Sequence, residues 1–198
     1  MSSDSLPALL IAAAIAALAA GCARGDAPGS YEASNKADCL PDLTLTDQNG
    51  RGISLASLKG KPVLIDFVYT SCTSTCPLQT AKMAKIARLL GPQLGSEVVI
   101  VSLTLDPETD TPARLNQYAR RYGADGRSWL FLTGAPQTID EALARFKLKR
   151  ERAADGQVMH VAAAFLIGVD GRQIRQYNGL VVTPETVVDD LHQFARAG

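Results

Sequence analysis

The sequence predicts one α/β domain in which a mixed β-sheet is covered by helices on both faces. Two mostly apolar runs, 63–69 and 98–103, are rich in β-branched residues, and such runs are typical of strands that are buried on both faces. A segment with apolar residues at helical spacing follows each run. Because the strand–helix–strand–helix series then ends in a hairpin and a helix, it indicates one mixed sheet.

Turn and cap signals divide the rest of the chain into elements. Asn49-Gly50 and Asp170-Gly171 are strong signals for β-hairpins. Thr111-Pro112 is a typical helix start, and Thr138 with Glu141 fits a capping box. The expected series is a hairpin at 43–55, a strand at 63–69, a helix from 77, a strand at 98–103, a helix from 112, a strand at 129–132, a helix carrying residues 139–146, strands at 162–169 and 173–177, and a helix from 184.

Composition excludes several classes of function. The 198 residues include 20 Lys+Arg and 20 Asp+Glu, so the net charge is zero and no general basic surface is available for nucleic acid. Aromatic residues make up only 6%, which leaves little for a base-stacking surface. Four cysteines are too few for a disulfide-dense scaffold. We therefore expect no nucleic-acid partner.

The first segment has the pattern of an export signal. Residues 6–20 are almost entirely Leu, Ile and Ala, shorter than the ~20 residues that span a bilayer but typical of a signal peptide. The small residues before Cys22 resemble the lipobox of bacterial lipoproteins, in which the cysteine is lipidated. We expect a lipoprotein-type signal at 1–22, a flexible tether at 23–38 and the folded domain at 39–198. The alternatives are an uncleaved anchor and simple secretion. All three possibilities place the domain outside the cytoplasm. With the lipoprotein-type signal, the domain is anchored to a membrane and faces the periplasm.

Cys72 and Cys76 lie in a loop between a buried strand and a helix. Ligands in α/β folds gather at such carboxyl ends of strands. The amide groups and dipole of a helix start favour thiolates, which are both redox nucleophiles and soft metal ligands. The pair therefore fits either a dithiol–disulfide couple or a metal site.

A metal would need a further ligand, and the chain has only two histidines. His160 precedes the strand expected at 162–169. If that strand runs antiparallel to 63–69, its start and the cysteine loop share one end of the sheet. A Cys, Cys, His set suits copper in both oxidation states. His192 falls on the polar side of the last helix and is expected at the surface.

Four features spread over residues 43–194 together resemble the Sco/SenC family of copper-binding, thioredoxin-like proteins that help to assemble cytochrome c oxidase. They are the segment 43–48, the Cys72/Cys76-Pro77 loop, Asp106-Pro107 with Asp110-Thr111-Pro112, and His160. The resemblance implies a thioredoxin-like fold with an N-terminal β-hairpin. It implies one Cu(I) or Cu(II) per chain, held by Cys72, Cys76 and His160. It also implies a client such as oxidase subunit two or a similar copper protein, which receives copper or has the cysteines of its binuclear copper site reduced.

The chain departs from the commoner family pattern at several positions, although the three ligands are kept. Thr73-Ser74 stand where many members have Pro-Asp, and Thr109 stands where the common pattern has Arg. Met159 and Val161 flank the histidine in place of Asp and Ser. These differences indicate a divergent branch.

Two acids are candidates for supporting the site. Asp66, six residues before Cys72, resembles in position the buried acid that serves the cysteine pair of thioredoxins; the alternative is a polar residue at the edge of the sheet. Asp106 follows the second buried strand and either orients His160 through a hydrogen bond or starts a turn before Pro107, which we slightly prefer. Cys39 and Met159 are expected to be packing residues, and the basic run 147–152 a solvated face.

Three functions fit these residues. The leading hypothesis is a membrane-tethered copper metallochaperone whose Cys72–Cys76 pair cycles between a dithiol that holds copper and a disulfide that does not, with a thiol reductant as a further partner. The second is a thiol–disulfide oxidoreductase that uses the same pair without needing His160. The third is a peroxide-reducing or redox-sensing relative, for which the supporting residues are not convincing.

Overall fold

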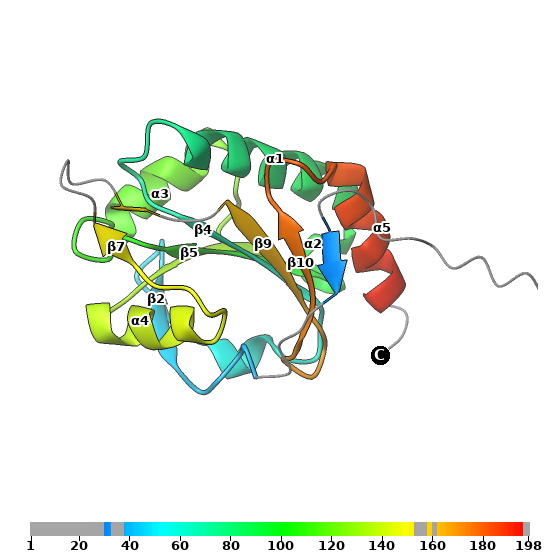
Figure 1. Cartoon of the computed structure of the whole chain (residues 1–198), viewed down its shortest axis with the longest axis horizontal. Coiled ribbons are helices and arrows are strands. Elements are labelled where there is room, and N and C mark those ends of the chain that lie inside the picture. The colour runs from blue at the N-terminus through cyan, green and yellow to red at the C-terminus, as the bar shows by residue number, and fades with distance from the viewer. Residues whose placement is uncertain (1–29, 33–37, 153–157, 160–161, 196–198) are drawn as a thin grey trace, which may run out of the picture.

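The longest apolar runs of the sequence form the centre of an eight-stranded mixed sheet. The computed structural model describes residues 30–32, 38–152, 158–159 and 162–195. The strand order is β1-β10-β9-β4-β5-β6-β2-β3. β4 (Val63–Val68), β5 (Val99–Thr104) and β6 (Trp129–Thr133) are parallel to one another (Figure 1). Every residue of β4 is buried, as expected for a strand covered on both faces.

Both predicted hairpins are present, one on each side of the parallel strands. β2 (Thr44–Asp47) pairs with β3 (Gly52–Ser54), and β2 also pairs with β6. The Asp47 carboxylate accepts hydrogen bonds from the backbone N–H groups of Asn49 and Arg51, which closes the turn. β9 (Ala163–Ile167) and β10 (Gln173–Asn178) form the second hairpin.

Part of the segment expected to be a tether is attached to the sheet. β1 (Ser30–Glu32) pairs antiparallel with β10, and Asp38 forms a β-bridge with Arg172. The described residues of this segment therefore extend the edge of the sheet. The predicted signal and Cys22 lie outside the described residues.

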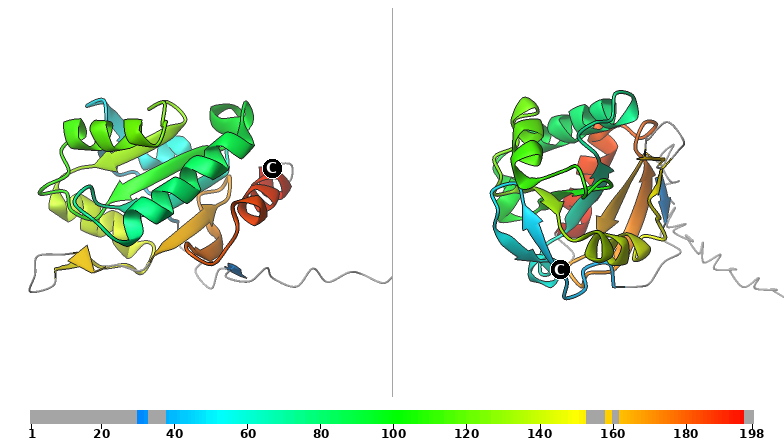
Figure 2. Two further views of the ribbon diagram at one scale, coloured as in Figure 1. Left: turned by 90° about the horizontal axis from the view of Figure 1, so that it is seen from above. Right: turned by 90° about the vertical axis from the view of Figure 1, so that its left-hand side faces the viewer.

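Helices cover both faces of the sheet (Figures 1 and 2). Apolar residues of α1, α3 and α5 pack on one face, and those of α4 pack on the other. The helices are α1 (Thr75–Leu90), α2 (Gln93–Ser96), α3 (Pro112–Arg121), α4 (Pro136–Ala144) and α5 (Pro184–Ala195), with a 3-10 turn η1 (Leu55–Leu58). The predicted two-faced architecture is confirmed.

One of the two predicted caps is wrong. The Thr111 side chain accepts a hydrogen bond from Arg114 N–H at 3.3 Å and caps α3 as expected. However, α4 is preceded by Ala135 and starts at Pro136, so Thr138 lies inside the helix. Proline suits the first helical position because its φ is already helical and its missing N–H is not needed there.

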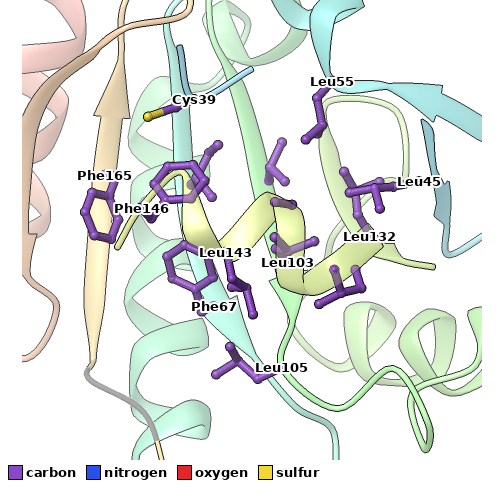
Figure 3. Close-up of a cluster of buried hydrophobic side chains, with 14 of the residues drawn as sticks. Cys39, Leu45, Leu55, Phe67, Leu103, Leu105, Leu132, Leu143, Phe146 and Phe165 are labelled. Atoms are coloured by element: carbon purple, nitrogen blue, oxygen red, sulfur yellow. The ribbon is translucent and has the colours of Figure 1, made fainter. Parts of the chain in front are cut away.

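Aromatic side chains fill the core between the sheet and α4. The rings of Phe67, Phe146 and Phe165 meet edge to face with centroids 5.1–5.7 Å apart, a favourable geometry for aromatic pairs. These rings belong to a larger cluster of buried apolar side chains, with Cys39 at one end and Leu105, which follows β5, at the other (Figure 3). The cluster thus extends along the strands from one end of the sheet to the other.

A small antiparallel pair, β7 (Glu151–Arg152) with β8 (Val158–Met159), projects from the domain before β9; we call it the arm. Figure 2 shows the arm at one end of the molecule. Val158 is buried against the α4-side core, so the arm is anchored at its base. Across the described stretches of the chain, no helix has the length and apolar character needed to span a membrane.

Candidate functional site

The two cysteines of the loop lie at the junction of β4 and α1. After β4, the Cys72 N–H donates to the Tyr69 carbonyl at 3.2 Å, which closes a turn that presents Cys72. α1 begins at Thr75, two residues before the predicted start, so Cys76 belongs to the first helical turn. Its N–H donates to Cys72 Sγ at 3.4 Å. Neither cysteine forms a disulfide with a described residue.

Cys72 is the more acidic of the two thiols. Burial disfavours its thiolate, but the N–H groups of Ser74 and Cys76 and the Cys76 thiol donate to its sulfur. These hydrogen bonds outweigh burial and lower the pKa of Cys72 to about 6. At neutral pH Cys72 is therefore a thiolate, ready to attack a disulfide or to bind a soft metal ion.

Cys76 has the opposite tendency. It is fully buried, and burial together with its hydrogen bond to Cys72 raises its pKa far above the usual range. A negative charge on Asp66 adds to this effect. The pair at neutral pH is therefore one thiolate and one thiol, which share a proton between two sulfurs.

Asp66 is a buried central residue, so the alternative that placed it at the edge of the sheet is wrong. It lies on β4, between β5 and β9, with no exposed surface. Ser102 donates to its Oδ1 at 2.6 Å, and Trp129 Nε1 donates in turn to Ser102 Oγ at 3.0 Å. Its Oδ2 has no hydrogen-bond partner among the described residues. Burial raises the pKa of Asp66 to about 7.

The sequence places His160 at the cysteine end of the sheet only if the strand that follows it runs antiparallel to the strand before the cysteines, and β9 runs in this direction. β9 runs antiparallel to β4, with Ala164 opposite Asp66, so β9 starts at the end of the sheet where β4 leads into the cysteine loop. Because β9 begins at Ala163, the chain enters the sheet at this end shortly after residue 160.

His160 itself lies outside the described residues, as does the side chain of Met159. Within the described ranges, no three side chains of His, Cys, Asp or Glu are grouped so as to hold a metal ion. The described part of the site thus supplies two sulfur donors. A soft, monovalent copper ion fits these donors in charge and type.

Asp106 starts a turn, as we slightly preferred, while the alternative, a hydrogen bond that orients His160, involves a residue outside the described ranges. The Asp106 carbonyl accepts the N–H groups of Thr109 and Asp110, and its buried carboxylate pairs with Arg152 of the arm at 2.7 Å. The basic run 147–152 is therefore not simply a solvated face. Arg150 is also paired, with Glu108 and Asp140, and its side chain is only 15% exposed.

The other singled-out residues lie away from the site. The Cys39 N–H donates to Gly171, at the end of the sheet opposite the cysteine loop, and the six residues of β4 separate the two ends by roughly 20 Å. Burial raises the pKa of Cys39 to about 11, so it is an inert packed thiol. His192 is half-buried, with Nε2 2.6 Å from Gln93 Oε1.

Sequence reasoning missed Asp110 as a functional candidate. Its carboxylate has no exposed surface and accepts hydrogen bonds from Thr70, just before the cysteines, and from Thr104, at the end of β5. The sequence does contain a signal for Asp110, because an acid shortly after a parallel strand lies at the carboxyl end of the sheet, where sites form. In the sequence, Asp110 serves only as part of the Asp110-Thr111-Pro112 feature that contributes to the family resemblance.

Comparison with known proteins decides the family. Residues 31–196 match the family model described as SCO1/SenC. The chain belongs to the SCO1/SenC family. The match covers nearly the whole predicted domain, and it confirms the resemblance inferred from the cysteine loop, the acids and His160.

Solved structures of Sco proteins share the fold. A SCO1/SenC family lipoprotein from Bacillus anthracis has a TM-score of 0.72 and 30% identity, over 79% of this chain and 94% of that one. BsSco, described as a member of the Sco family of cytochrome c oxidase assembly proteins with a disulfide switch, has a TM-score of 0.72 and 32% identity, over 85% and 98%. ScoI from Bradyrhizobium japonicum, solved with copper bound, has a TM-score of 0.66 and 32% identity, over 77% and 96%. The predicted thioredoxin-like mixed sheet is confirmed.

Proposed function

We propose that this protein is a copper metallochaperone that loads, or prepares for loading, the binuclear copper site of a respiratory oxidase. The observation that carries the proposal is the pairing of one stabilised thiolate, Cys72, with a buried thiol, Cys76, in a member of the SCO1/SenC family. Copper bound to a related ScoI and the oxidase-assembly role of BsSco support it.

Cys72, Cys76 and His160 would hold one copper ion. The Cys72 thiolate is available at neutral pH, whereas Cys76 must release its proton when the metal binds. His160 completes the set with a neutral imidazole, which also suits Cu(II). Transfer of Cu(I) to a client then requires only the exchange of these ligands for the client's thiolates and imidazoles, with no change in oxidation state.

The difference in acidity between the two thiols also favours a second activity, reduction of a client disulfide. The Cys72 thiolate would attack one client sulfur and release the other as a thiolate. Cys76, after losing its proton, would then attack Cys72 Sγ and release the second client sulfur. Two electrons pass to the client, which becomes a dithiol, and Cys72–Cys76 becomes a disulfide that a thiol reductant must restore.

We assign Asp66 the role of proton acceptor for Cys76. Its unpartnered Oδ2, its burial and its electrostatic effect on Cys76 support this role. A carboxylate with a pKa of about 7 is half ionised at neutral pH and can take up the proton that Cys76 loses on metal binding or disulfide formation.

We further propose that the protein is exported and anchored to a membrane through a lipid on Cys22, facing the periplasm, with residues 1–22 as the signal. The apolar segment before Cys22 and the lipoprotein description of the Bacillus anthracis relative support this anchor. Metabolic labelling with a radioactive fatty acid should label the wild type and not Cys22→Ser. Equal labelling of both proteins would contradict the anchor.

A client assay separates the two activities. The reduced protein, loaded with Cu(I), is mixed with the soluble copper domain of an oxidase subunit two in its reduced apo form, and separately the copper-free protein is mixed with the oxidised domain. Copper transfer that is lost in Cys72→Ser and His160→Ala, but kept in His192→Ala, supports the chaperone. Disulfide reduction that is unaffected by His160→Ala, without copper transfer, moves the protein to the oxidoreductase class.

A further inference from the structure

The loop between β5 and α3, residues 105–111, contacts both chain segments of the proposed site. Asp110 faces the cysteine side. Its Oδ1 accepts the Thr70 hydroxyl at 2.5 Å and the Thr70 N–H at 3.1 Å, and its Oδ2 accepts the Thr104 hydroxyl at 2.6 Å. One buried carboxylate thus ties the ends of β4 and β5 to the start of α3.

Thr70 matters because of its place in the turn that carries Cys72. The turn is closed by the bond from Cys72 N–H to the Tyr69 carbonyl, and Thr70 is its second residue. Asp110 holds both the N–H and the hydroxyl of Thr70, and so fixes the orientation of the peptide groups within the turn. The position of Cys72 Sγ relative to the N–H groups of Ser74 and Cys76 depends on this turn.

The same loop holds the arm. Glu108 accepts two hydrogen bonds from Arg150 Nη1, at 2.8 and 3.1 Å, and Asp140 of α4 accepts two more from Nε and Nη2, at 2.7 and 3.1 Å. Arg152 pairs with Asp106 of the loop at 2.7 Å. Because Arg150 is only 15% exposed, its paired geometry is partly shielded from solvent and fixes the start of β7.

We propose that the β5–α3 loop is the positioning element of the site: Asp110 sets the cysteine turn, and Glu108 sets, through Arg150, the arm that leads to His160. The proposal rests on the proposed function. None of these three side chains is a metal ligand or a catalytic residue; each acts through the segment that it holds. The loop thereby joins two segments that are about 80 residues apart in sequence.

The cysteine side is tested without copper, by the rate at which iodoacetamide alkylates Cys72 as a function of pH. Asp110→Ala leaves three donors of Thr70 and Thr104 without their acceptor, so the turn loosens and the profile moves to higher pH, with a rate at least about fivefold lower near pH 6.5. Asp110→Asn keeps one acceptor oxygen and should restore most of the rate. Asp47→Asn is the matched control, because Asp47 is equally buried but lies in the β2–β3 hairpin.

The arm side is tested by amide hydrogen exchange and by copper affinity. Arg150→Gln should speed exchange of the Val158 N–H and weaken Cu(II) binding about tenfold, the usual effect of losing a group that supports a ligand, while the Cys72 profile stays unchanged. Arg175→Gln is the control, since Arg175 is similarly buried at 17% exposure and pairs with Asp190 of α5.

The outcomes test the role of the loop independently of the proposed function. An Asp110→Ala protein that stays folded with an unmoved Cys72 profile overturns the cysteine side, and an Arg150→Gln protein with unchanged Val158 exchange overturns the arm side. Failure of the wild type to bind copper overturns the proposed function. The alkylation and exchange results still decide the role of the loop in that case.

Discussion

At the scale of single residues, the two thiols of the site differ because of where α1 begins. Cys72 precedes the helix and receives its free N–H groups, whereas Cys76 lies inside the first turn and is buried. The helix start thus stabilises a negative charge on one sulfur only. In the proposed function, Cys72 would be the sulfur that meets a client or a metal first, and Cys76 would complete the reaction.

This difference predicts a pH profile for thiol modification. In the reduced protein, the alkylation rate of Cys72 should reach half its maximum near pH 6, because the pKa of Cys72 is lowered to about 6. Cys76→Ala removes one donor but keeps its N–H, so the midpoint should rise without reaching that of a free thiol. A midpoint at the ordinary thiol pKa in the wild type would contradict the account.

Asp66→Asn should stabilise the protein at neutral pH. The pKa of Asp66 is raised from 3.8 to about 7, so between these values the folded state binds more protons than the unfolded state. The free energy of unfolding of the wild type therefore falls as pH rises through this window. Relative to the wild type, Asp66→Asn should gain stability as the pH rises from 4 to 7, by on the order of 3 kcal/mol over that range.

Urea denaturation at several pH values measures this difference. Asp170→Asn provides a control, since that carboxylate is exposed. Parallel stability profiles for Asp66→Asn and the wild type would show that Asp66 is not a strained buried acid. The role of proton acceptor for Cys76 would then have no basis.

At the scale of elements, pattern signals gave the strands and hairpins but not every boundary. The buried runs and the two Asx-Gly turns were predicted correctly because burial on two faces and left-handed turn residues leave clear marks. The sequence predicts that α1 starts at Pro77, whereas the helix begins at Thr75. Proline is tolerated throughout a first turn, so it marks a helix start only approximately.

The arm and the β5–α3 contacts were beyond sequence reasoning. Strands of two residues, such as β7 and β8, have no periodicity to detect. Asp110 accepts hydrogen bonds from Thr70, 40 residues away, and Arg150 pairs with Glu108, 42 residues away, so only the folded topology brings these residues together. Candidate ligands can therefore be proposed from residue types in the sequence, whereas residues that hold the neighbouring segments in place cannot.

Gly179, in the loop after β10, lies where an added side chain would lower the stability of the fold. A Cβ on Gly179 would lie 2.0 Å from Oε1 of Gln79, a buried residue of α1, and Gly179 also donates to the Ala162 carbonyl. Gly179→Ala should therefore force Gln79 aside and destabilise the fold by about 1–3 kcal/mol.

Thermal denaturation compares this variant with Gly52→Ala. Gly52 is a fair control because a Cβ there would make only an ordinary contact, 3.5 Å from Thr44 Cγ2. The melting temperature of Gly179→Ala should fall well below that of Gly52→Ala. Equal melting temperatures would show that Gln79 moves at no cost.

At the scale of the whole molecule, the mixed direction of the strands assembles the site. The parallel strands β4 and β5 deliver the cysteine loop and the β5–α3 loop to one end of the sheet. The antiparallel strand β9 starts at that same end, which was the condition set by the sequence argument for His160. Three segments that are remote in sequence therefore meet at one end, while Cys39 is left at the other.

The central claim is most directly tested by titrating the reduced protein with Cu(I) in competition with a chromophoric chelator, followed by Cu(II) absorbance on the same samples. The account predicts one tightly bound copper per chain and a thiolate charge-transfer band that is lost in Cys72→Ser and in His160→Ala but kept in Cys39→Ser. Failure to retain copper against the chelator, together with ready closure and reduction of a Cys72–Cys76 disulfide, would contradict it.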